Sequence, residues 1–508
     1  MNSLDLLRKQ LPAWGVDAVL VPHEDQYLNE YLPPWAEVLD WLSGFTGSAG
    51  TAVVTAKDAA LFVDSRYTIQ AKNEVSSKHW SSFLINDMKP EIWLDGKAKR
   101  VGYDPSCLSA SRAEQLIETF KAKSMEVVAL PVGSVHGLMQ NKSNAHDLSI
   151  DAFPSHFEGC DAQEKLKLIR AELEQSGLDA ALIADPSLVS WALGIRARVT
   201  KMTPLALARA LVTKDRLFVE LDPVHAQVLP VEGVIGALPL FEGLVGYDPD
   251  TTPPANIVRY KNVKPVKGLF QKLRAAKTPQ SRAVIKEVLR RDNRILDKFF
   301  KHLVQYLQTH TAYEHEIAEM IAAARAKHPL YVEESFDAIV GFRENGAIIH
   351  YHPKKGSDKL VKGRGVLLID CGGQYQDGTT DRTTTILLDP TDEEKRVYEA
   401  VVKSHKALAR AVFPVGTTGA QLDGICKKPL WDAGYDCPHG IGHGVGQFLS
   451  VHEGPFSISP RGGHALPEGL LVSIEPGVYL EGKFGVRHER LYFVEQADGK
   501  PGMMQFNG

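Results

Sequence analysis

The alternation of apolar and polar residues repeats itself in the first half of the chain. Residues 6–21, LLRKQLPAWGVDAVLV, have apolar side chains at helical spacing, then a glycine, then a short apolar run. Residues 168–183, LIRAELEQSGLDAALI, show the same order. Each stretch predicts an amphipathic helix that ends at the glycine and leads into a buried strand.

A second pair of similar stretches follows these helix–strand units. Residues 51–64, TAVVTAKDAALFVD, and residues 209–222, RALVTKDRLFVELD, each predict two strands joined by a turn at Lys-Asp. Helix–glycine–strand units are common in unrelated proteins, but two matching pairs in the same order favour a duplication. We therefore expect two related N-terminal α/β domains, at residues 1–157 and 158–277, with a linker near residue 157.

A third domain is predicted to occupy residues 278–508. Thr278 can cap a helix that has Pro279 in its first turn, and the apolar residues that follow recur at helical spacing as far as Leu303. This long amphipathic helix is expected to open the new domain.

Strands and two more capped helices alternate in the rest of this domain. Thr391 and Glu394 form a capping box before the first of them. The second is expected over residues 416–431, before a stop at Gly434. The whole chain is thus predicted to be a mixed α/β (α+β) protein.

Composition narrows the class of protein only slightly. A chain of 508 residues is too long for one core, and 44% hydrophobic and 24% charged residues are ordinary for a globular protein. The formal net charge of −4 indicates neither a nucleic-acid nor an anionic membrane partner. We find no signal pattern at the N-terminus and no apolar run near the ~20 residues of a membrane span.

The cysteines indicate a reducing compartment. Their number is odd, their positions are scattered, and no C-x-x-C motif occurs. They are Cys107, Cys160, Cys371, Cys426 and Cys437. Free thiols, and hence a cytoplasmic protein, are the expectation.

Residues 439–444 read HGIGHG and place two histidines four positions apart. A helix would bring them together, but each glycine costs a helix interior about 1 kcal/mol, and the glutamate of an H-E-x-x-H motif is absent. In an extended chain His439 and His443 share a face but stand about 13 Å apart. One ion could hold both only if the chain bent sharply. We therefore expect one to bind metal while the other acts elsewhere in the same cleft; two solvated histidines are the alternative.

Four carboxylates and one histidine in the C-terminal third occur in strand-like, apolar surroundings. They are Asp370 in LLIDCGGQY, Asp381 in DGTTDRTTTILL, His443 in HGIGHG, Glu475 in LLVSIEPGVYL and Glu489 in FGVRHERLYFV. A buried carboxylate without a partner is very costly. Four of them, each on a separate strand, need a shared explanation, although four independent structural acids are the alternative.

Two divalent cations would supply that explanation, because they balance four negative charges. Without metal, two carboxylates about 4 Å apart repel by about 4 kcal/mol at an effective dielectric constant of about 20. Oxygen-rich ligation with a single nitrogen suits Mn²⁺ best, and Zn²⁺ or Co²⁺ would also fit. Two such ions can polarise a carbonyl group and activate water.

The ordered set of five ligands resembles that of the pita-bread metallopeptidases. Further stretches are similar to those of the long, three-domain Xaa-Pro aminopeptidases (aminopeptidase P): GFTGSAGTAVV, FVDSRY, SFDAIVGFRENGAIIHYHP, QYQDGTTD, GAQLDGICKKPLWDAG, HGIGHGVGQFLSVHEGP and SIEPGVY. The resemblance covers nearly the whole chain. It implies two creatinase-like domains followed by a pita-bread catalytic domain.

The resemblance also implies a role for each ligand. Asp370 would hold one metal ion, and Asp381 and Glu489 would bridge both ions. His443 and Glu475 would hold the other ion, with Glu475 also the candidate general base for the attacking water.

Three further histidines would face the substrate in such an enzyme, namely His350, His439 and His452. They would orient the scissile carbonyl, stabilise the oxyanion or move a proton. The implied substrates are short peptides with proline at the second position, whose ring removes an N–H and fixes φ. A homodimer would also be compatible with the resemblance.

Two alternatives stay open, and three details depart from the family pattern. Prolidase performs the same chemistry on dipeptides alone, and some pita-bread relatives are binding proteins that have lost their ligands. Relatives usually read D-[IV]-T-R-T after the second aspartate, whereas this chain reads DRTTT, with Arg382 early and Thr384 at the arginine position. His488 directly precedes Glu489, where relatives carry Ile or Leu. The tail after Glu489 is short, which puts a dimer contact through it in doubt.

Overall fold

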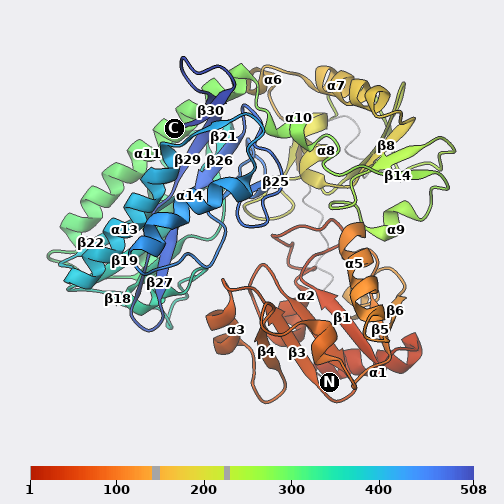
Figure 1. The fold of residues 1–508 in the computed structure, drawn as a ribbon, viewed down its shortest axis with the longest axis horizontal. Coiled ribbons are helices and arrows are strands. Elements are labelled where there is room, and N and C mark those ends of the chain that lie inside the picture. The colour runs from red at the N-terminus through yellow and green to blue at the C-terminus, as the bar shows by residue number, and fades with distance from the viewer. Residues whose placement is uncertain (1, 140–148, 222–228) are drawn as a thin grey trace. The chain divides into compact units, whose positions relative to one another are not determined.

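The computed structural model describes residues 2–139, 149–221 and 229–508 and divides into two compact units (Figure 1). The first unit comprises Met1–Ala152, Ala162–Lys201 and Leu205–Phe270. The second comprises Phe153–Asp161, Met202–Pro204 and Gln271–Gly508. Asp222, which ends the second predicted strand pair, lies outside the described residues.

The first unit contains two six-stranded sheets with the same strand arrangement. Their orders are β4-β3-β2-β1-β5-β6 and β12-β11-β10-β8-β13-β14. The first consists of β1 (Ala18–Pro22), β2 (Thr51–Thr55), β3 (Ala59–Val63), β4 (Ser81–Leu84), β5 (Arg100–Tyr103) and β6 (Glu126–Ala129). The second consists of β8 (Ala180–Ile183), β10 (Arg209–Thr213), β11 (Leu217–Glu220), β12 (Val234–Ile235), β13 (Val245–Tyr247) and β14 (Val263–Pro265).

The pairing directions match as well, strand for strand. In the first sheet β2 is antiparallel to β1 and β3, and the other three pairs are parallel. In the second sheet β10 is antiparallel to β8 and β11, and the other three pairs are again parallel. The expected pair of related α/β domains is therefore confirmed.

The expected helix–glycine–strand units account for the start of each sheet. Helix α1 (Ser3–Trp14) ends at Gly15, whose φ of 66° is the left-handed conformation that glycine adopts at low cost. The chain then enters β1, which is buried along its whole length. Helix α7 (Ala162–Gln175) is followed in the same way by Gly177, with φ of 64°, and by β8.

Shorter elements complete the first unit. They are α2 (Val38–Ser43), α3 (Thr68–Glu74), α4 (Pro90–Trp93), α5 (Ala110–Lys121), η1 (His136–Leu138), α8 (Pro186–Leu193), α9 (Pro254–Ile257), and the antiparallel pair β7 (Ile150–Ala152) and β9 (Ile195–Ala197).

The second unit is built from two halves, each an antiparallel sheet covered by a pair of helices. The first half contains α11 (Pro279–Tyr306), α12 (Glu314–Arg325) and the sheet of β17 (Ile339–Phe342), β19 (Gly365–Cys371) and β22 (Arg382–Leu388). The second half contains α13 (Asp392–Ala409), α14 (Gly419–Asp432) and the sheet of β23 (Val412–Pro414), β30 (Met503–Asn507), β29 (Arg490–Gln496), β26 (Leu471–Ile474), β24 (Gly442–Gly444) and β25 (Glu453–Ile458).

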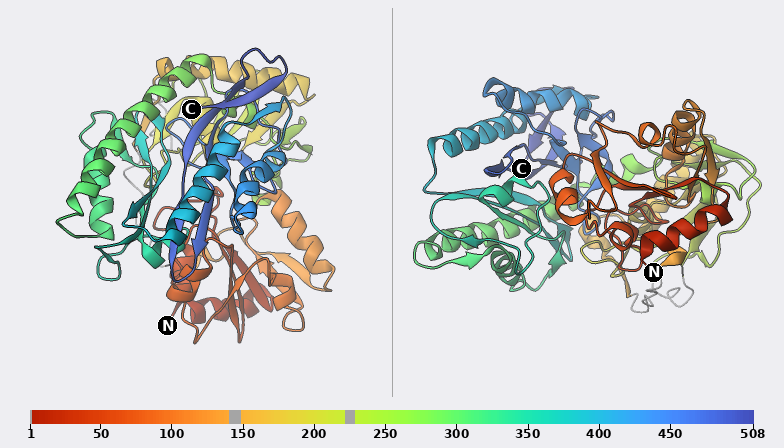
Figure 2. Two further views of the ribbon diagram at one scale, coloured as in Figure 1. Left: turned by 60° about the vertical axis from the view of Figure 1, so that its left-hand side comes forward. Right: turned by 90° about the horizontal axis from the view of Figure 1, so that it is seen from below.

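Each half buries its own core between helices and sheet. In the first half, Phe300 of α11 and Ile321 of α12 pack with Ile369 of β19. In the second half, Val401 of α13 and Leu422 of α14 pack with Val472 of β26. The right-hand view of Figure 2 shows the green helices and the blue helices of this unit on opposite sides, with strands between them.

The remaining elements of this unit are small. They are α6 (Ser155–Glu158), α10 (Gln271–Ala275), η3 (Arg343–Ala347), β15 (Ala312–Tyr313), β16 (Tyr331–Glu334), β18 (Leu360–Val361), β20 (Gly373–Tyr375), β21 (Gly378–Thr379) and the hairpin of β27 (Gly477–Leu480) and β28 (Phe484–Arg487).

The predicted helix starts are mostly confirmed. Thr278 caps α11 by accepting a hydrogen bond from Ser281 N, and Thr391 forms its capping box with Glu394 at the start of α13. The helix predicted over residues 416–431 was placed too early, because Gly416 has a left-handed φ of 90° and the cap is Thr418.

The residues near position 157 form a folded part of the second unit instead of a free linker. Helix α6 packs on α11, the Thr278 hydroxyl donates to the carbonyl of Glu158, and Gln280 donates to that of His156. The domain boundaries at 157 and 277 stay predictions. No helix in the described part of the chain is both long and apolar enough to span a membrane.

Candidate metal centre

The strand alternation of the first half points Asp370 away from the helices. Leu367, Ile369 and Cys371 of β19 pack in the core beneath α11 and α12, so the residue between the last two faces the opposite side. Asp370 pairs with Thr383 of β22, which also brings Asp381, two residues earlier, to this inner face.

The second half presents its ligands where two paired strands leave their sheet. β26 and β29 pair through Ile474 and Arg490. Glu475 comes directly after β26, so it does not lie within the strand as the sequence predicted, and Glu489 comes directly before β29. The hairpin of β27 and β28 joins the two carboxylates.

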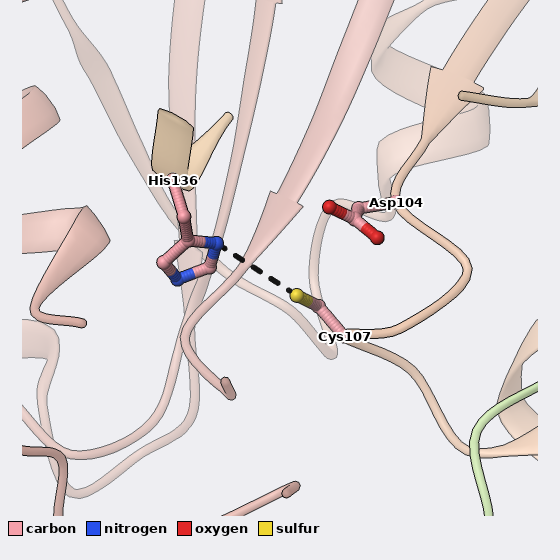
Figure 3. A group of neighbouring side chains, drawn as sticks. All are labelled: Asp104, Cys107 and His136. Carbon is pink, nitrogen blue, oxygen red and sulfur yellow. Dashed lines mark hydrogen bonds between the residues drawn. The ribbon is translucent and has the colours of Figure 1, made fainter. Parts of the chain in front are cut away.

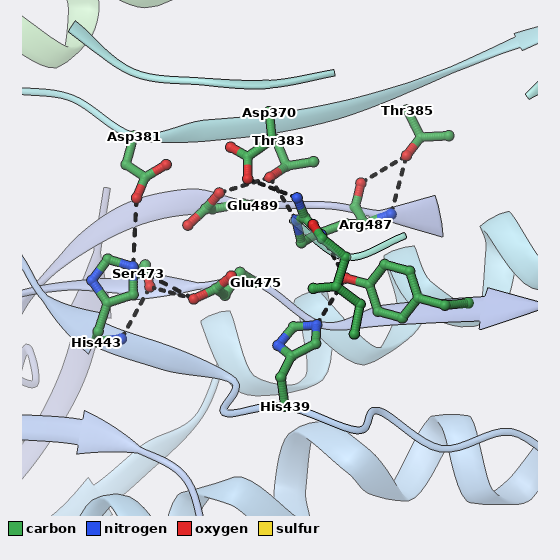
Figure 4. Close-up of polar contacts among 12 residues, drawn as sticks. Asp370, Asp381, Thr383, Thr385, His439, His443, Ser473, Glu475, Arg487 and Glu489 are labelled. Carbon is green, nitrogen blue, oxygen red and sulfur yellow. Dashed lines mark hydrogen bonds and ion pairs between the residues drawn. The ribbon is translucent and has the colours of Figure 1, made fainter. Parts of the chain in front are cut away.

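The side chains from both halves converge on one place (Figure 4). Ligand atoms of Asp381, His443 and Glu489 all lie within 4.8 Å of one another. Nε2 of His443 is 3.5 Å from a carboxylate oxygen of Asp381 and 3.5 Å from one of Glu475. Asp370 lies in the same group, and its pKa responds to Asp381 and Glu475. The structure thus brings together all five predicted ligands.

Hydrogen bonding leaves ligand atoms available. Within the described part of the chain, Oδ1 of Asp370 and Oε1 of Glu489 are buried and have no hydrogen-bond partner. The other ring nitrogen of His443, Nδ1, donates to the carbonyl of Gly444 at 3.0 Å. That bond turns Nε2 towards the carboxylates, and a metal ion in place of the proton on Nε2 would give the usual arrangement of a metal-bound histidine.

The shifted pKa values of this group indicate an excess of negative charge. Burial, with Asp381 and Glu475 adding to it, raises the pKa of Asp370 to about 6. Burial and the neighbouring carboxylates raise the pKa of Glu489 well above its usual range. Burial alone would lower the pKa of His443, but Asp381 and Glu475 outweigh it and raise that pKa to about 9. Divalent cations would relieve this repulsion, so the donor set fits a metal centre.

Arg487 organises one side of the centre and was given no role from the sequence. Its side chain is 2% exposed and donates to Oδ2 of Asp370 at 2.7 Å, to the hydroxyl of Tyr479 at 2.7 Å and to the hydroxyl of Thr383 at 3.1 Å. Thr383 in turn donates to Oε2 of Glu489 at 2.8 Å. These bonds orient two of the carboxylates.

The residues two positions away from each ligand could have been identified as these partners from the sequence. Arg487 lies two residues before Glu489, Thr383 two after Asp381, and Ser473 two before Glu475. Ser473 accepts from the backbone N–H of His443 at 3.1 Å and donates to Glu475 at 3.4 Å. Residues two apart share one face of a strand, so each ligand carries a polar neighbour.

The two histidines of HGIGHG have separate partners. Nδ1 of His439 donates to the carbonyl of Gly440 at 2.8 Å, which leaves Nε2 to accept from the hydroxyl of Tyr479 at 2.8 Å. The hydroxyl oxygen of Tyr479 accepts a hydrogen bond from Arg487, so the hydroxyl proton is available for His439. His443 contacts Asp381 and Glu475 instead, so the two rings have different neighbours.

The other two predicted histidines lie beside this network. The ring of His452 packs edge-on against that of His443, with centroids 4.4 Å apart. His350 follows Ile349, whose carbonyl accepts from Arg487 at 3.3 Å. Their roles toward a substrate stay predictions.

The glycines beside His443 are required by the close approach of neighbouring backbone. A Cβ atom on Gly442 would lie 2.0 Å from the carbonyl oxygen of Ser473, and one on Gly444 would lie 2.4 Å from that of Glu453. Both oxygens belong to strands that pair with β24, so they cannot move independently.

Replacing Gly442 with alanine is therefore expected to lower the free energy of unfolding by at least about 1–3 kcal/mol, the usual cost of overpacking, and to displace His443. Thermal unfolding and metal content would measure the two effects. Gly440→Ala is the matched control, because its Cβ would lie 3.3 Å from the side chain of Ser459 and 3.7 Å from the carbonyl oxygen of Ile458, without a severe clash. Equal unfolding temperatures for the two variants would contradict the steric explanation.

The departures from the family pattern point away from the centre. The guanidinium of Arg382 donates to Asn293 at 2.8 Å and to Asp297 at 2.6 Å, both on α11, and to Thr384 at 3.2 Å. The ring of His488 packs edge-on against that of His405 on α13, with centroids 4.6 Å apart. These residues alternate with the ligands along the chain and so occupy the opposite face.

Family comparisons agree with this fold. The metallopeptidase family M24 matches residues 285–496, and two descriptions of the creatinase/prolidase N-terminal domain match residues 4–131 and 142–234. Together they define the class: a pita-bread metallopeptidase domain preceded by two creatinase-type domains.

Individual relatives identify the family within this class. The probable Xaa-Pro aminopeptidase P of Laccaria bicolor is 32% identical over 529 residues, covering 97% of this chain and 82% of the relative. The crystal structure of X-prolyl aminopeptidase from Caenorhabditis elegans, a cytosolic enzyme with a di-nuclear active site, is 27% identical with a TM-score of 0.92 over 99% of this chain and 90% of that chain. The chain belongs to the Xaa-Pro aminopeptidase P family of metallo-aminopeptidases, and the resemblance noted in the sequence is confirmed.

The prolidase alternative is supported less well. The prolidase from Pyrococcus horikoshii OT3 is 25% identical with a TM-score of 0.54, and the match covers 65% of this chain and 95% of the prolidase. A third of this chain has no counterpart there, whereas the aminopeptidase matches extend over nearly all of it.

Proposed function

We propose that this chain removes the first residue from short peptides by hydrolysing the bond before a proline at the second position. The observation that carries the proposal is the group of four carboxylates and His443, assembled from both halves of a domain of the M24 family. Family membership over nearly the full length supports the proline specificity.

The centre is proposed to hold two divalent ions, with Mn²⁺ the best match to four oxygen ligands and one nitrogen. Asp370 would hold one ion and Asp381 and Glu489 both, while His443 and Glu475 would hold the other. Bound ions would polarise the scissile carbonyl and make water a better nucleophile. The di-nuclear active site of the C. elegans relative supports this number of ions.

The protein's own groups would then manage protons and orientation. Glu475, held by Ser473, is the proposed general base for the attacking water. His350, His439 and His452 would face the substrate and stabilise the developing oxyanion. Because both ring nitrogens of His439 are engaged, contact with a substrate requires Nε2 to exchange Tyr479 for it.

Tripeptides of the Arg-Pro-Pro type are expected to be cut after the first residue in the presence of Mn²⁺. Replacing the second-position proline with alanine should lower kcat/KM by at least about 10²-fold, or about 2.7 kcal/mol, because proline's fixed φ pre-shapes the peptide. Steady-state hydrolysis of both peptides tests this, with the Arg-Pro dipeptide as control. Turnover of the dipeptide alone would instead favour prolidase.

Location and assembly are further parts of the proposal. Five free thiols suit a reducing compartment, and the C. elegans relative is cytosolic, so we place the protein in the cytoplasm. We also propose a homodimer and domains at residues 1–157, 158–277 and 278–508. Size measured by light scattering would test the dimer.

A further inference from the structure

A second group of metal-ligating side chains lies in the first N-terminal domain, in a different unit from the catalytic centre. Asp104, Cys107 and His136 each offer one ligand atom, and these atoms lie within 4.8 Å of one another (Figure 3). Sγ of Cys107 is 3.8 Å from Nδ1 of His136. Figure 3 shows the thiol between the imidazole and the carboxylate.

Local hydrogen bonds hold the three side chains in place. Asp104 follows β5, and its Oδ1 accepts from the N–H and the hydroxyl of Ser106 at 2.9 and 2.6 Å, which shapes the turn leading to Cys107. Its Oδ2 accepts from the N–H of Gly133 at 2.7 Å, which fixes the segment leading to His136. A carboxylate oxygen has two lone pairs, so Oδ2 can still bind a cation.

The separations suit a small tetrahedral ion. Zinc binds sulfur at about 2.3 Å and imidazole nitrogen at about 2.0 Å, so two such ligands around a tetrahedral ion stand about 3.5 Å apart. The observed 3.8 Å needs only a small movement. Asp104 and Cys107 are 3% and 2% exposed, and His136 is partly exposed.

The surroundings favour a cation of borderline softness. Burial keeps the pKa of His136 low, so its ring is neutral and able to ligate. Burial, followed by the charge of Asp104, raises the pKa of the Cys107 thiol, and the carboxylates of Asp25 and Glu24 act in the same direction. A thiol, an imidazole and a carboxylate together select zinc-like ions over Mn²⁺, Mg²⁺ or Ca²⁺.

We propose that Asp104, Cys107 and His136 bind one divalent cation of the zinc class, with the fourth position left to water. Binding removes the thiol proton and forms the metal–sulfur bond, so one proton is released for each ion bound. The ion would connect the turn between β5 and α5 to η1. Its role is independent of the peptidase centre, whose predicted ligands include no cysteine.

Cobalt(II) titration of the full-length, metal-free protein tests the proposal. Cobalt bound to a thiolate gives a strong near-ultraviolet charge-transfer band, which oxygen and nitrogen ligands at the peptidase centre cannot produce. We expect the band to saturate at about one equivalent bound to this site, with release of about one proton at neutral pH. Cys107→Ser should abolish the band and leave Mn²⁺-dependent peptidase activity unchanged.

Two matched controls locate the thiol. Cys160→Ser removes a half-buried cysteine and Cys437→Ser one close to His439, and both should keep the band. Asp104→Asn and His136→Gln retain the thiol and should each weaken cobalt binding at least about tenfold. A missing band, a band that survives Cys107→Ser, or unchanged affinity in both thiol-retaining variants overturns the proposal. Those last two variants decide the matter if Cys107→Ser does not fold.

Discussion

Glutamine at position 489 is expected to remove metal and nearly all activity while the protein stays folded. Glu489 is 1% exposed; Oε2 accepts from Thr383, and Oε1 is buried and has no hydrogen-bond partner among the described residues. An amide keeps the shape and the acceptor for Thr383 but cannot supply charge to a cation. We expect kcat/KM to fall at least about 10³-fold, or about 4 kcal/mol. Asp381→Asn should behave alike.

The same change should not weaken the metal-free protein. Burial and three neighbouring carboxylates disfavour the charged form of Glu489, so a neutral amide relieves repulsion, and the metal-free variant should unfold at the same or a higher temperature. Glu495→Gln is the matched control, because it lies on the same strand β29 and pairs at the surface with Lys286. Elemental analysis that finds two full equivalents of metal in Glu489→Gln would refute the centre as described.

Alanine substitutions at the two histidines of HGIGHG are expected to impair the protein in different ways. His443→Ala removes the imidazole that faces Asp381 and Glu475, so metal affinity and activity should fall together. His439→Ala removes a group bonded to Tyr479 and not to the carboxylates, so both metals should stay while kcat falls about 10²–10⁴-fold.

Metal stoichiometry beside steady-state kinetics separates the two variants. An unchanged KM for His439→Ala would place its effect in the transition state. The Tyr479→Phe variant is a useful comparison, because it removes the hydroxyl that bonds to Nε2 of His439 but keeps the imidazole ring of His439. Equal metal loss in the two histidine variants, or full activity of His439→Ala, would show that this division of labour is wrong.

The cluster of candidate metal ligands could be predicted from the sequence because these residues violate a strong rule. A carboxylate in an apolar stretch of sequence is costly to bury, so Asp370, Asp381, Glu475 and Glu489 stand out wherever they lie in the fold. The duplicated sheets were predictable for a similar reason, since helix, glycine and strand recur in order.

The groups that orient the ligands were not predicted, because their partners are distant in the chain. Arg487 reaches Asp370 across 117 positions, and Tyr479 reaches His439 across 40. A buried arginine or tyrosine is compatible with many partners, so position alone does not reveal its role. The need for Gly442 is equally invisible, because it depends on the carbonyl oxygen of Ser473 in the next strand.

The proposed ligands come from two halves of one domain, and this origin would link metal supply to the lifetime of the fold. Asp370 and Asp381 come from one sheet, and His443, Glu475 and Glu489 from the other, so the unfolded chain offers no comparable site. Any ion bound only by the native state adds its binding free energy to folding, about 2.7 kcal/mol at a free concentration of 100 Kd. A cell that runs short of the ion would therefore hold not merely an idle enzyme but a less durable one, more open to proteolysis and turnover.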